Sequence, residues 1–340
     1  IIENSEKILY DLAEKGSFNS NIIKFDEAVR QTIDMASNAY KNEEGIVGVP
    51  TGLRDLDDRL GGLHKSDLVI IAGRPAMGKT ALATNIAFNA ATNIQKTNRK
   101  SCIAFFSLEM SSEQLSTRIL AEQSRIKSND IRRGKISEEQ FDKFIETSKN
   151  IAELPLYIDE TPAISIAAMS NRARRIKRLF GLDMIIVDYA DLLKPTATGF
   201  KSQELRHSLG NIYEELRAIG QTFDIPVWTA SQTNRSGLNA EVITMESISE
   251  AFNKCFVADF IFTLSRTIED KNVNAARMFV AKNRNGPDGL VYPMKMDTSN
   301  VLLEVLEPDG NSITEINKEA AKNQKQRLAD IYKKFKKENK

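Results

Sequence analysis

Three shortages in the sequence exclude whole classes of protein. The 340 residues include two cysteines, Cys102 and Cys255, too few for a disulfide framework, so we expect both to be buried in a protein of a reducing compartment. No apolar run approaches the roughly 18 residues of a membrane-spanning helix, so we expect no membrane partner. The 47 Lys and Arg residues nearly balance the 46 Asp and Glu residues, and the net charge of +1 excludes a uniformly basic surface. Any nucleic-acid binding must therefore depend on local patches of charge.

The composition nevertheless supports a packed core, because 41% of the residues are apolar and 27% are charged. The length suits two domains or one large α/β domain. The chain begins Ile1-Ile2, with neither a methionine nor a signal-peptide pattern. We therefore expect a fragment of a longer polypeptide, with residues 1–20 as a remnant of its N-terminal region.

Two segments near the ends of the chain differ from the rest. Before residue 41, apolar residues recur every three or four positions and predict an amphipathic helix from about 26 to 40: Phe25, Val29, Ile33, Ala36 and Tyr40. The apolar face of this helix must be buried, either on its own domain or on a neighbouring subunit. After residue 316 lysines dominate, and we expect residues 313–340 to form a basic, solvated tail, with a nucleic-acid or partner contact as the alternative.

From residue 49 onward, short apolar runs alternate with longer segments of helical periodicity. The runs lie at 68–72, 103–106, 184–187, 226–230 and 260–264, and the helical segments at 81–91, 111–124 and 203–223. Apolar strands that are buried on both faces and joined by helices predict an α/β fold with a mostly parallel central sheet flanked by helices. Residues 277–281 and 290–296 flank a Gly/Pro turn and predict a C-terminal hairpin.

Residues 73–80, GRPAMGKT, match the complete phosphate-binding pattern G-x-x-x-x-G-K-[ST], after an apolar strand and before a helix. Backbone N–H groups of such a loop wrap a polyphosphate, so side chains must be absent at Gly73 and Gly78. We expect Lys79 to contact the β- and γ-phosphates of ATP and the Thr80 hydroxyl to bind Mg²⁺. The alternative is a glycine-rich turn that binds nothing. The predicted nucleotide-binding residues are Gly73, Arg74, Pro75, Ala76, Met77, Gly78, Lys79, Thr80 and Ala81.

Three polar residues follow predicted strands, at the edge where parallel sheets bind ligands. Asp188 ends the third apolar run and is predicted to hold Mg²⁺ through its water shell. Glu109 follows the second run and is predicted to polarise the water that attacks the γ-phosphate; the alternative is a helix-initiating residue, since Ser111 is a good cap. Gln232 follows the fourth run and is predicted to contact the γ-phosphate, with a surface glutamine as the alternative.

These motifs, in this order, resemble the ATPase domain of replicative DNA helicases of the DnaB family. Residues 48–57 and 61–63 are similar to the first segment of that domain, and four later stretches are similar to its successive helicase motifs: 73–80, 106–110, 186–189 and 231–235. Residues 282–287, KNRNGP, are similar to its last motif. The resemblance covers about residues 20–310 and is specific, because RecA-type recombinases share only part of this set.

The resemblance implies a RecA-like P-loop core, residues 46–312, assembled as a hexameric ring around single-stranded DNA. It implies that ATP is hydrolysed at subunit interfaces to drive movement along the strand and unwinding of duplex DNA, 5′ to 3′, in the cytoplasm of a bacterial or phage-infected cell. Residues 21–45 match the linker helix that docks on the adjacent subunit. Primase and a helicase loader are the further partners implied for the full-length protein.

The resemblance also assigns roles at the interface between subunits. Lys282 and Arg284 match the lysine and the arginine finger that enter the site from the neighbouring subunit; the alternative is an ordinary solvated hairpin. A guanidinium supplied in this way stabilises charge on the transferring phosphoryl group and makes hydrolysis depend on subunit contact. Arg266, at the end of its strand, matches a position that stacks on the nucleotide base in related ring helicases.

The sequence departs from the bacterial members of the family at two places. Ala190-Asp191 stand where the family usually has Leu-Gln. Residues 245–252 lack the arginine and glycine of the bacterial DNA-binding loop and are closer to helicases of T-even-type phages. Segments 194–206 and 235–254 remain candidates for holding DNA phosphates. The residues predicted to contact DNA are Lys201, Arg206, Arg235, Ser249 and Glu250.

Three other interpretations fit parts of the pattern. A RecA-type recombinase or a clock-type ring ATPase has the same fold without unwinding, but the Lys282 and Arg284 pair counts against it. A P-loop kinase of small molecules would act without an intersubunit finger, and DNA-stimulated ATP hydrolysis would argue against it. A nucleotide-gated structural ring would have no use for Glu109 and Asp188, because a scaffold needs no water-activating group.

Overall fold

The computed structural model describes residues 23–41, 46–195, 205–233, 242–243, 248 and 253–306. It divides into two units, residues 1–45 and 46–340, which are described separately. Helix α2 (Phe25–Lys41) occupies most of the described part of the first unit, where the apolar spacing predicts a helix. Its apolar side chains are largely exposed, by 85% at Phe25, 60% at Ile33 and 93% at Tyr40. Among the described helices of both units, none has the length and apolar character needed to cross a membrane.

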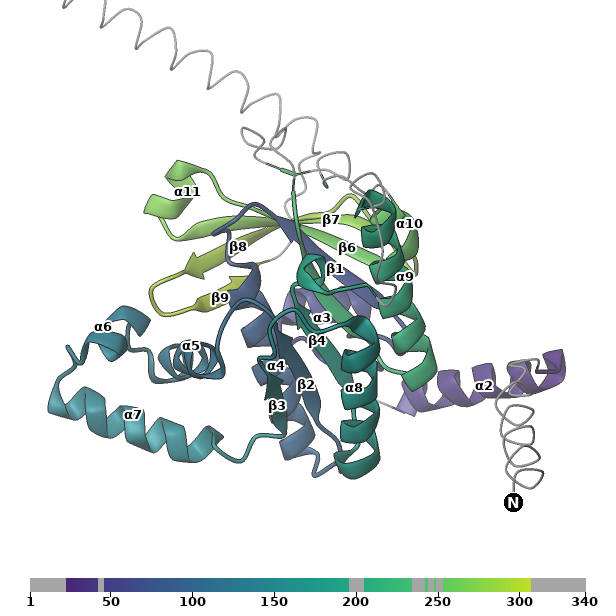
Figure 1. The fold of residues 1–340 in the computed structure, drawn as a ribbon, viewed down its shortest axis with the longest axis horizontal. Coiled ribbons are helices and arrows are strands. Elements are labelled where there is room, and N and C mark those ends of the chain that lie inside the picture. Colours follow the sequence, from purple (N-terminus) through teal and green to yellow (C-terminus); the bar gives the residue numbers. More distant parts are fainter. Residues whose placement is uncertain are drawn as a thin grey trace, which may run out of the picture. The chain divides into compact units, whose positions relative to one another are not determined.

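One mixed sheet forms the centre of the second unit. Nine strands are described there, in the order β3-β2-β4-β5-β1-β6-β7-β8-β9 (Figure 1). The parallel part consists of β1 (Leu68–Gly73), β2 (Ile103–Ser107), β3 (Leu156–Asp159), β4 (Met184–Asp188), β5 (Val227–Gln232) and β6 (Phe260–Ser265). Antiparallel pairing adds β7 (Ala275–Asn283), β8 (Val291–Asp297) and β9 (Leu302–Val305). The predicted α/β fold with a mostly parallel sheet is confirmed, and the predicted hairpin is the β7–β8 pair.

Helices cover both faces of this sheet, because successive side chains of a buried strand point to opposite sides. Val69 and Ile71 of β1 belong to one hydrophobic core, and Leu68 and Ile70 belong to the other. The helices that pack into the first core are α3 (Arg54–Leu60), α4 (Lys79–Lys96) and α5 (Ser112–Ser124). Those that pack into the second are α8 (Ile166–Phe180) and α9 (Leu205–Phe223). Shorter elements complete the described part: α6 (Ser128–Arg133), α7 (Glu138–Ile151), the 3₁₀ helix η1 (Ala190–Leu192), α10 (Asn253–Val257) and α11 (Ile268–Asn272).

The start of α5 shows how local sequence sets an element boundary near the site. The Ser111 side chain accepts a hydrogen bond from the Gln114 N–H, and the Gln114 side chain accepts one from the Ser111 N–H. This reciprocal capping satisfies backbone donors that would otherwise lack partners at the helix start. Because Ser111 is the cap, Glu109 lies between β2 and α5 and does not initiate the helix.

The strand register defines two opposite edges of the sheet. Gly73 pairs with Gln232, and Ser107 pairs with Asp188, so the carboxyl ends of β1, β2, β4 and β5 meet at one edge. Strand β7 runs against β6, with Asn283 opposite Phe260, so the carboxyl end of β7 lies at the other edge. The two edges are separated by the length of β1, about 17 Å for a strand of this length.

Candidate functional site

The predicted phosphate loop, residues 73–80, connects β1 to α4 at the first of these edges. Gly78 has φ +95°, and a Cβ built there would come within 3.0 Å of Met296 Cε. A Cβ built on Gly73 would come within 3.0 Å of the Leu264 carbonyl oxygen. Both positions therefore require glycine, for backbone conformation at Gly78 and for close packing at Gly73. The loop presents its backbone and the start of α4 on the same side, the arrangement that binds anions.

The Lys79 ammonium lies over this loop. It donates hydrogen bonds to the carbonyl oxygens of Gly73, at 2.7 Å, and Arg74, at 3.0 Å. Burial lowers the pKa of Lys79, while the nearby negative charges of Asp188, Glu109 and Asp191 act in the opposite direction. Asp188 and Glu109, which the sequence assigned to the same site, thus both act electrostatically on the loop lysine.

Asp188 and Thr80 form a candidate Mg²⁺ site. Asp188 is 2% exposed at the end of β4, and its carboxylate accepts a hydrogen bond from the Thr80 hydroxyl. Burial raises the pKa of Asp188, and the Thr80 hydrogen bond opposes that rise. The Oδ2 atom of Asp188 is buried and has no hydrogen-bond partner among the described residues. A hydrated divalent cation is the kind of partner that would satisfy such an oxygen, so these residues fit Mg²⁺.

Glu109 lies exposed just beyond β2, and the backbone around it is hydrogen-bonded to the end of β4. The Leu108 N–H donates to the Asp188 carbonyl at 2.9 Å, and the Ser107 hydroxyl donates to the Met110 carbonyl at 2.6 Å. The charge of Glu109 contributes to the raised pKa of Asp188, which indicates that the two carboxylates are close. An accessible carboxylate beside the candidate Mg²⁺ site is suited to accept a proton from water.

Gln232 joins the same group of residues. Its Nε2 atom donates a hydrogen bond to the Tyr189 hydroxyl at 3.1 Å, and its side chain is half-buried. Burial raises the pKa of Tyr189, and the negative charges of Glu109, Asp191 and Asp188 raise it further. The amide of Gln232 is therefore held at the nucleotide edge and is not a free surface group.

Sequence reasoning missed Arg118, which α5 brings to this edge. Burial lowers the pKa of Arg118, and the charges of Asp188 and Glu109 oppose that shift. A cation therefore lies among the carboxylates of the site. No motif contains Arg118, so the local sequence gives no sign that its charge acts on Asp188 and Glu109.

Arg266 lies buried at the end of β6. The residue is 3% exposed, and its guanidinium donates to the carbonyls of Ala275, at 2.9 Å, and Met296, at 3.2 Å. Its own carbonyl accepts from Arg74 Nη2 at 3.0 Å. These hydrogen bonds join Arg266, at the end of β6, to the antiparallel strands β7 and β8. The expectation that Arg266 stacks on a nucleotide base stays a prediction.

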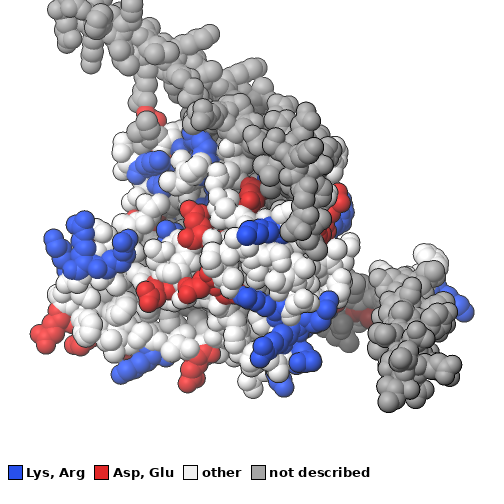
Figure 2. All heavy atoms as spheres, viewed as in Figure 1, with Lys and Arg blue, Asp and Glu red and all other residues white. Residues whose placement is uncertain are grey.

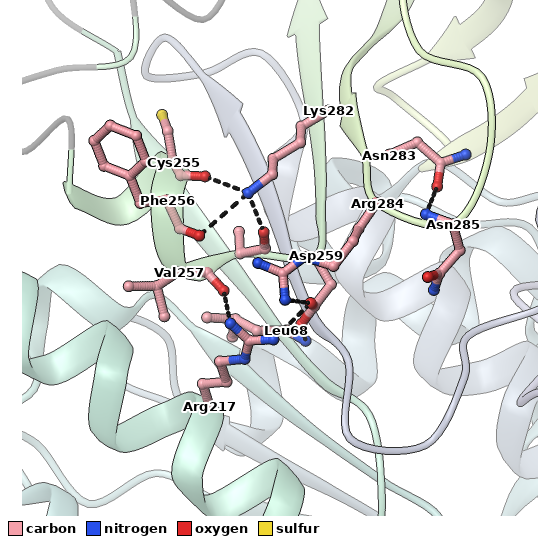
Figure 3. Close-up of polar contacts among 11 residues, drawn as sticks. Leu68, Arg217, Cys255, Phe256, Val257, Asp259, Lys282, Asn283, Arg284 and Asn285 are labelled. Atoms are coloured by element: carbon pink, nitrogen blue, oxygen red, sulfur yellow. Dashed lines mark hydrogen bonds and ion pairs between the residues drawn. The ribbon is translucent and has the colours of Figure 1, made fainter.

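Arg284 and Lys282 lie at the opposite edge of the sheet (Figure 3). The Arg284 guanidinium pairs with the Asp259 carboxylate at 2.9 Å, and Asp259 also pairs with Arg217 at 2.9 Å. The other carboxylate oxygen of Asp259 accepts from the Leu68 N–H at 3.0 Å, where β1 begins. Lys282 donates to backbone carbonyls at the end of α10: Cys255 at 2.7 Å, Ala258 at 2.7 Å and Phe256 at 3.2 Å.

The predicted DNA contacts are mostly outside the described residues. This holds for Lys201, Arg235, Ser249 and Glu250, and for the side chain of Arg206, whose backbone lies in α9. The predicted remnant 1–20 and the basic tail 313–340 are also outside. On the face shown in Figure 2, Lys and Arg gather in separate patches, one of them over α8, with acidic and uncharged surface between them.

The fold and the site define a class, a P-loop nucleotide-binding domain with a RecA-like core. The chain belongs to the DnaB-like helicase C-terminal domain family, whose family model matches residues 48–298. Among curated relatives it is 36% identical over 326 residues to the replicative DNA helicase DnaB of Rickettsia conorii, covering 87% of this chain and 65% of the relative. It is 31% identical over 297 residues to the replicative DNA helicase DnaC of Bacillus subtilis, covering 86% of this chain and 64% of the relative. The chain thus spans slightly less than two thirds of the length of these relatives.

Two solved structures share the fold at 24% sequence identity. One is a separate ATPase domain, which superposes with a TM-score of 0.74 over 84% of this chain and 99% of that one. The other is a DnaB-like replicative helicase, solved in work on its interactions with primase, which superposes with a TM-score of 0.72 over 90% of this chain and 74% of that one. Both confirm the RecA-like architecture of the second unit.

Proposed function

We propose that this chain is the ATPase motor of a replicative DNA helicase, which hydrolyses ATP between copies of itself in a hexameric ring to move along single-stranded DNA and unwind duplex DNA 5′ to 3′. The observation that carries the proposal is the separation of Lys79 and Arg284 onto opposite edges of the sheet. An arginine finger about 17 Å from its own phosphate loop is too far to act there, so it suits a nucleotide held by the next copy. Family membership and this arrangement count against a small-molecule kinase.

The residues at the nucleotide edge take complementary roles in this proposal. Lys79 and the loop N–H groups hold the phosphates, and Thr80 and Asp188 hold Mg²⁺, which supplies charge neutralisation when bound. Glu109 accepts a proton from the attacking water. Its carboxylate is available for this role because it is exposed and does not cap α5. Gln232, hydrogen-bonded to Tyr189, is placed to respond to the terminal phosphate. Arg284 and Lys282 of the adjacent copy stabilise the charge that develops in the transition state.

The exposed apolar stripe of α2 supports docking of this helix on an adjacent subunit. Exposed apolar side chains such as Phe25 and Tyr40 are costly in water, so a partner surface is expected to cover them. Segments 194–206 and 235–254 are the proposed DNA loops, since both connect to strands or helices that border the nucleotide edge. Primase and a helicase loader are proposed partners of a longer protein that contains this chain.

The proposal is tested by the ATPase rate per chain, measured over a range of protein concentrations with and without single-stranded DNA. We expect the rate per chain to rise with concentration as copies assemble, and to rise again when DNA is added. A rate per chain that is independent of concentration would contradict hydrolysis between copies. An unchanged rate on addition of DNA would contradict a DNA motor.

A further inference from the structure

Lys254, the last residue of the candidate DNA segment 235–254, is a buried cation to which the sequence assigns no individual role. Its side chain is 3% exposed, and its ammonium donates to Asp191 Oδ1 at 2.6 Å and to Ser231 Oγ at 3.2 Å. The ammonium also lies 4.8 Å from the centre of the Tyr213 ring, and the Tyr213 hydroxyl donates to the same Asp191 oxygen at 2.8 Å. A buried charge is tolerated only where it is paired and hydrogen-bonded, so these contacts fix the position of Lys254.

The partners of Lys254 border the nucleotide edge of the sheet. Asp191 lies in η1, shortly after Asp188, and Ser231 directly precedes Gln232 on β5. The charge of Asp191 also acts on the phosphate loop, where burial lowers the pKa of Lys79 and the Asp191 carboxylate opposes that lowering. One end of the Lys254 contact network is therefore attached to the part of the sheet that holds the chain's own nucleotide.

The helix that carries Lys254 also binds Lys282. Helix α10 spans only Asn253–Val257, and the Lys254 carbonyl accepts from the Ala258 N–H at 3.1 Å. The carbonyls at its end point toward the Lys282 ammonium and accept its three hydrogen bonds (Figure 3). Carbonyls at a helix end carry partial negative charge, so they attract the ammonium as well as bonding to it.

Helix α9 holds α10 at both of its ends. Tyr213 contacts Lys254 at the start, and Arg217, one turn further along α9, donates to the Val257 carbonyl at 3.0 Å at the end. Arg217 also pairs with Asp259, the carboxylate that binds Arg284. Helix α10 therefore connects the edge formed by the carboxyl ends of β1, β4 and β5 to the edge that carries Lys282 and Arg284, and its contacts hold it in place at both ends.

We propose that Lys254 is a positioning residue for Lys282 and Arg284: by pairing with Asp191 it fixes α10, and the carbonyls of α10 in turn fix Lys282. The proposal rests on the proposed function, because it assumes that this pair acts on the nucleotide of the adjacent copy. Loss of the Lys254 charge removes the ion pair at the start of α10, and among the described residues the Tyr213 hydroxyl is then the remaining side-chain partner of the Asp191 carboxylate. A catalytic group displaced by even 1 Å can lose about 10²-fold in rate, so a small shift of α10 is sufficient.

The first test compares Lys254→Met, which keeps the length of the side chain, with Lys254→Arg, which keeps the charge. We expect Lys254→Met to lower kcat for ATP by about 10- to 100-fold while KM changes less than about twofold, since the phosphate loop is untouched. Lys254→Arg should recover part of the loss. The matched control is Lys65→Met, because Lys65 is exposed and pairs with the exposed Asp224 at the surface. A proportional rise in KM would contradict the proposal.

The second test assigns Lys254 to one side of the subunit junction by mixing inactive variants. A Lys79→Ala chain lacks a working phosphate loop but keeps its finger, and an Arg284→Ala chain lacks the finger but keeps its loop. If Lys254 positions the finger, Lys254→Met should regain activity when mixed with Lys79→Ala and should not regain it with Arg284→Ala. Should Lys254→Met fail to fold, the double variant Lys254→Met/Asp191→Asn, which leaves no unpaired buried charge, should behave in the same way.

Each outcome of the mixing decides the assignment. Rescue by Arg284→Ala instead of Lys79→Ala would mean that Lys254 acts on its own chain's nucleotide through Asp191, and the proposal would fall. Rescue by both or by neither would indicate a general effect on folding and would also overturn it. The reference mixture of Lys79→Ala with Arg284→Ala reports on the proposed function separately. If the reference mixture stays inactive in oligomers that contain both chains, and Arg284→Ala added to the wild type lowers activity only in proportion, Arg284 does not act in trans and the proposed role of Lys254 is wrong as well.

Discussion

The Arg284 guanidinium and the Asp259 carboxylate form an ion pair at 2.9 Å, at the edge of the sheet where β1 begins. Asp259 is 3% exposed, and a buried carboxylate without a partner is strongly destabilising. Arg217 also pairs with Asp259 at 2.9 Å, so the carboxylate keeps a cationic partner when Arg284 turns toward another chain. The contacts of Asp259 are therefore compatible with two states of Arg284: paired with Asp259 in its own chain, or turned toward the nucleotide of an adjacent copy.

Glu109→Gln should separate nucleotide binding from hydrolysis. The amide has the size of the carboxylate but accepts no proton from water, so we expect ATP affinity to be retained and turnover to fall by about 10²- to 10⁴-fold. Affinity is measured with a fluorescent ATP analogue and turnover by phosphate release. Glu113→Gln, at an exposed position in the first turn of α5, is the matched control and should behave as the wild type. An equal loss of affinity and turnover in Glu109→Gln would make Glu109 a structural residue.

Gly78→Ala should disrupt the phosphate loop by more than backbone strain alone. An alanine at φ +95° costs about 1–2 kcal/mol, and its Cβ would also press against Met296 Cε at 3.0 Å. The control is Gly134→Ala, where φ is +64° and nothing lies within 4 Å of the added Cβ. We expect both variants to lose thermal stability and only Gly78→Ala to lose nucleotide affinity. Retained affinity in Gly78→Ala would show that the loop tolerates a side chain at this position.

Glu122, on the buried side of α5, should make stability depend on pH. Burial raises its pKa from 4.5 to about 7, and its Oε2 atom has no hydrogen-bond partner among the described residues. The folded chain then holds a proton that the unfolded chain releases above pH 4.5, so the stability contributed by the neutral form is lost as the pH rises to about 7. The loss is about 3 kcal/mol at most.

Glu122→Gln stays neutral at every pH and isolates this effect. We expect the midpoint of thermal unfolding of the wild type to fall relative to Glu122→Gln between pH 4.5 and about 7, and the gap to stay constant above that range. Glu113→Gln should run parallel to the wild type across the series. A constant gap between wild type and Glu122→Gln at all pH values would show that Glu122 titrates normally.

The parts of the fold and site that the sequence predicts are those set by short segments. The phosphate loop, the buried strands and the polar residues at their ends are local patterns, and parallel pairing brings Gly73, Ser107, Asp188 and Gln232 to one edge whatever the rest of the chain does. Strand β3 was missed because it is short and only partly buried, so no continuous apolar run marks it.

Contacts between distant segments were not predictable in the same way. Nothing in the local sequence around Lys254 indicates that its ammonium pairs with Asp191. Nor does the position of Arg266 at the end of a strand predict that its guanidinium donates hydrogen bonds to backbone carbonyls of β7 and β8. Such contacts depend on the register of the whole sheet.

The central claim, that Arg284 acts on the nucleotide of an adjacent copy, is open to direct measurement. Arg284→Ala should bind ATP almost as the wild type does, because its own phosphate loop is intact, and should lose about 10³-fold in turnover. Lys79→Ala should lose both affinity and turnover. Each variant alone is therefore inactive for a different reason.

The decisive measurement is the ATPase rate of the two variants mixed in one oligomer, with mixed assembly verified by native mass spectrometry. Junctions that combine the loop of an Arg284→Ala chain with the finger of a Lys79→Ala chain contain both parts, so we expect activity to reappear in the mixture and to depend on assembly. Two results together would contradict the account. The mixture would stay inactive, and adding Arg284→Ala to the wild type would lower activity only in proportion to the amount added. Arg284 would then act within its own chain.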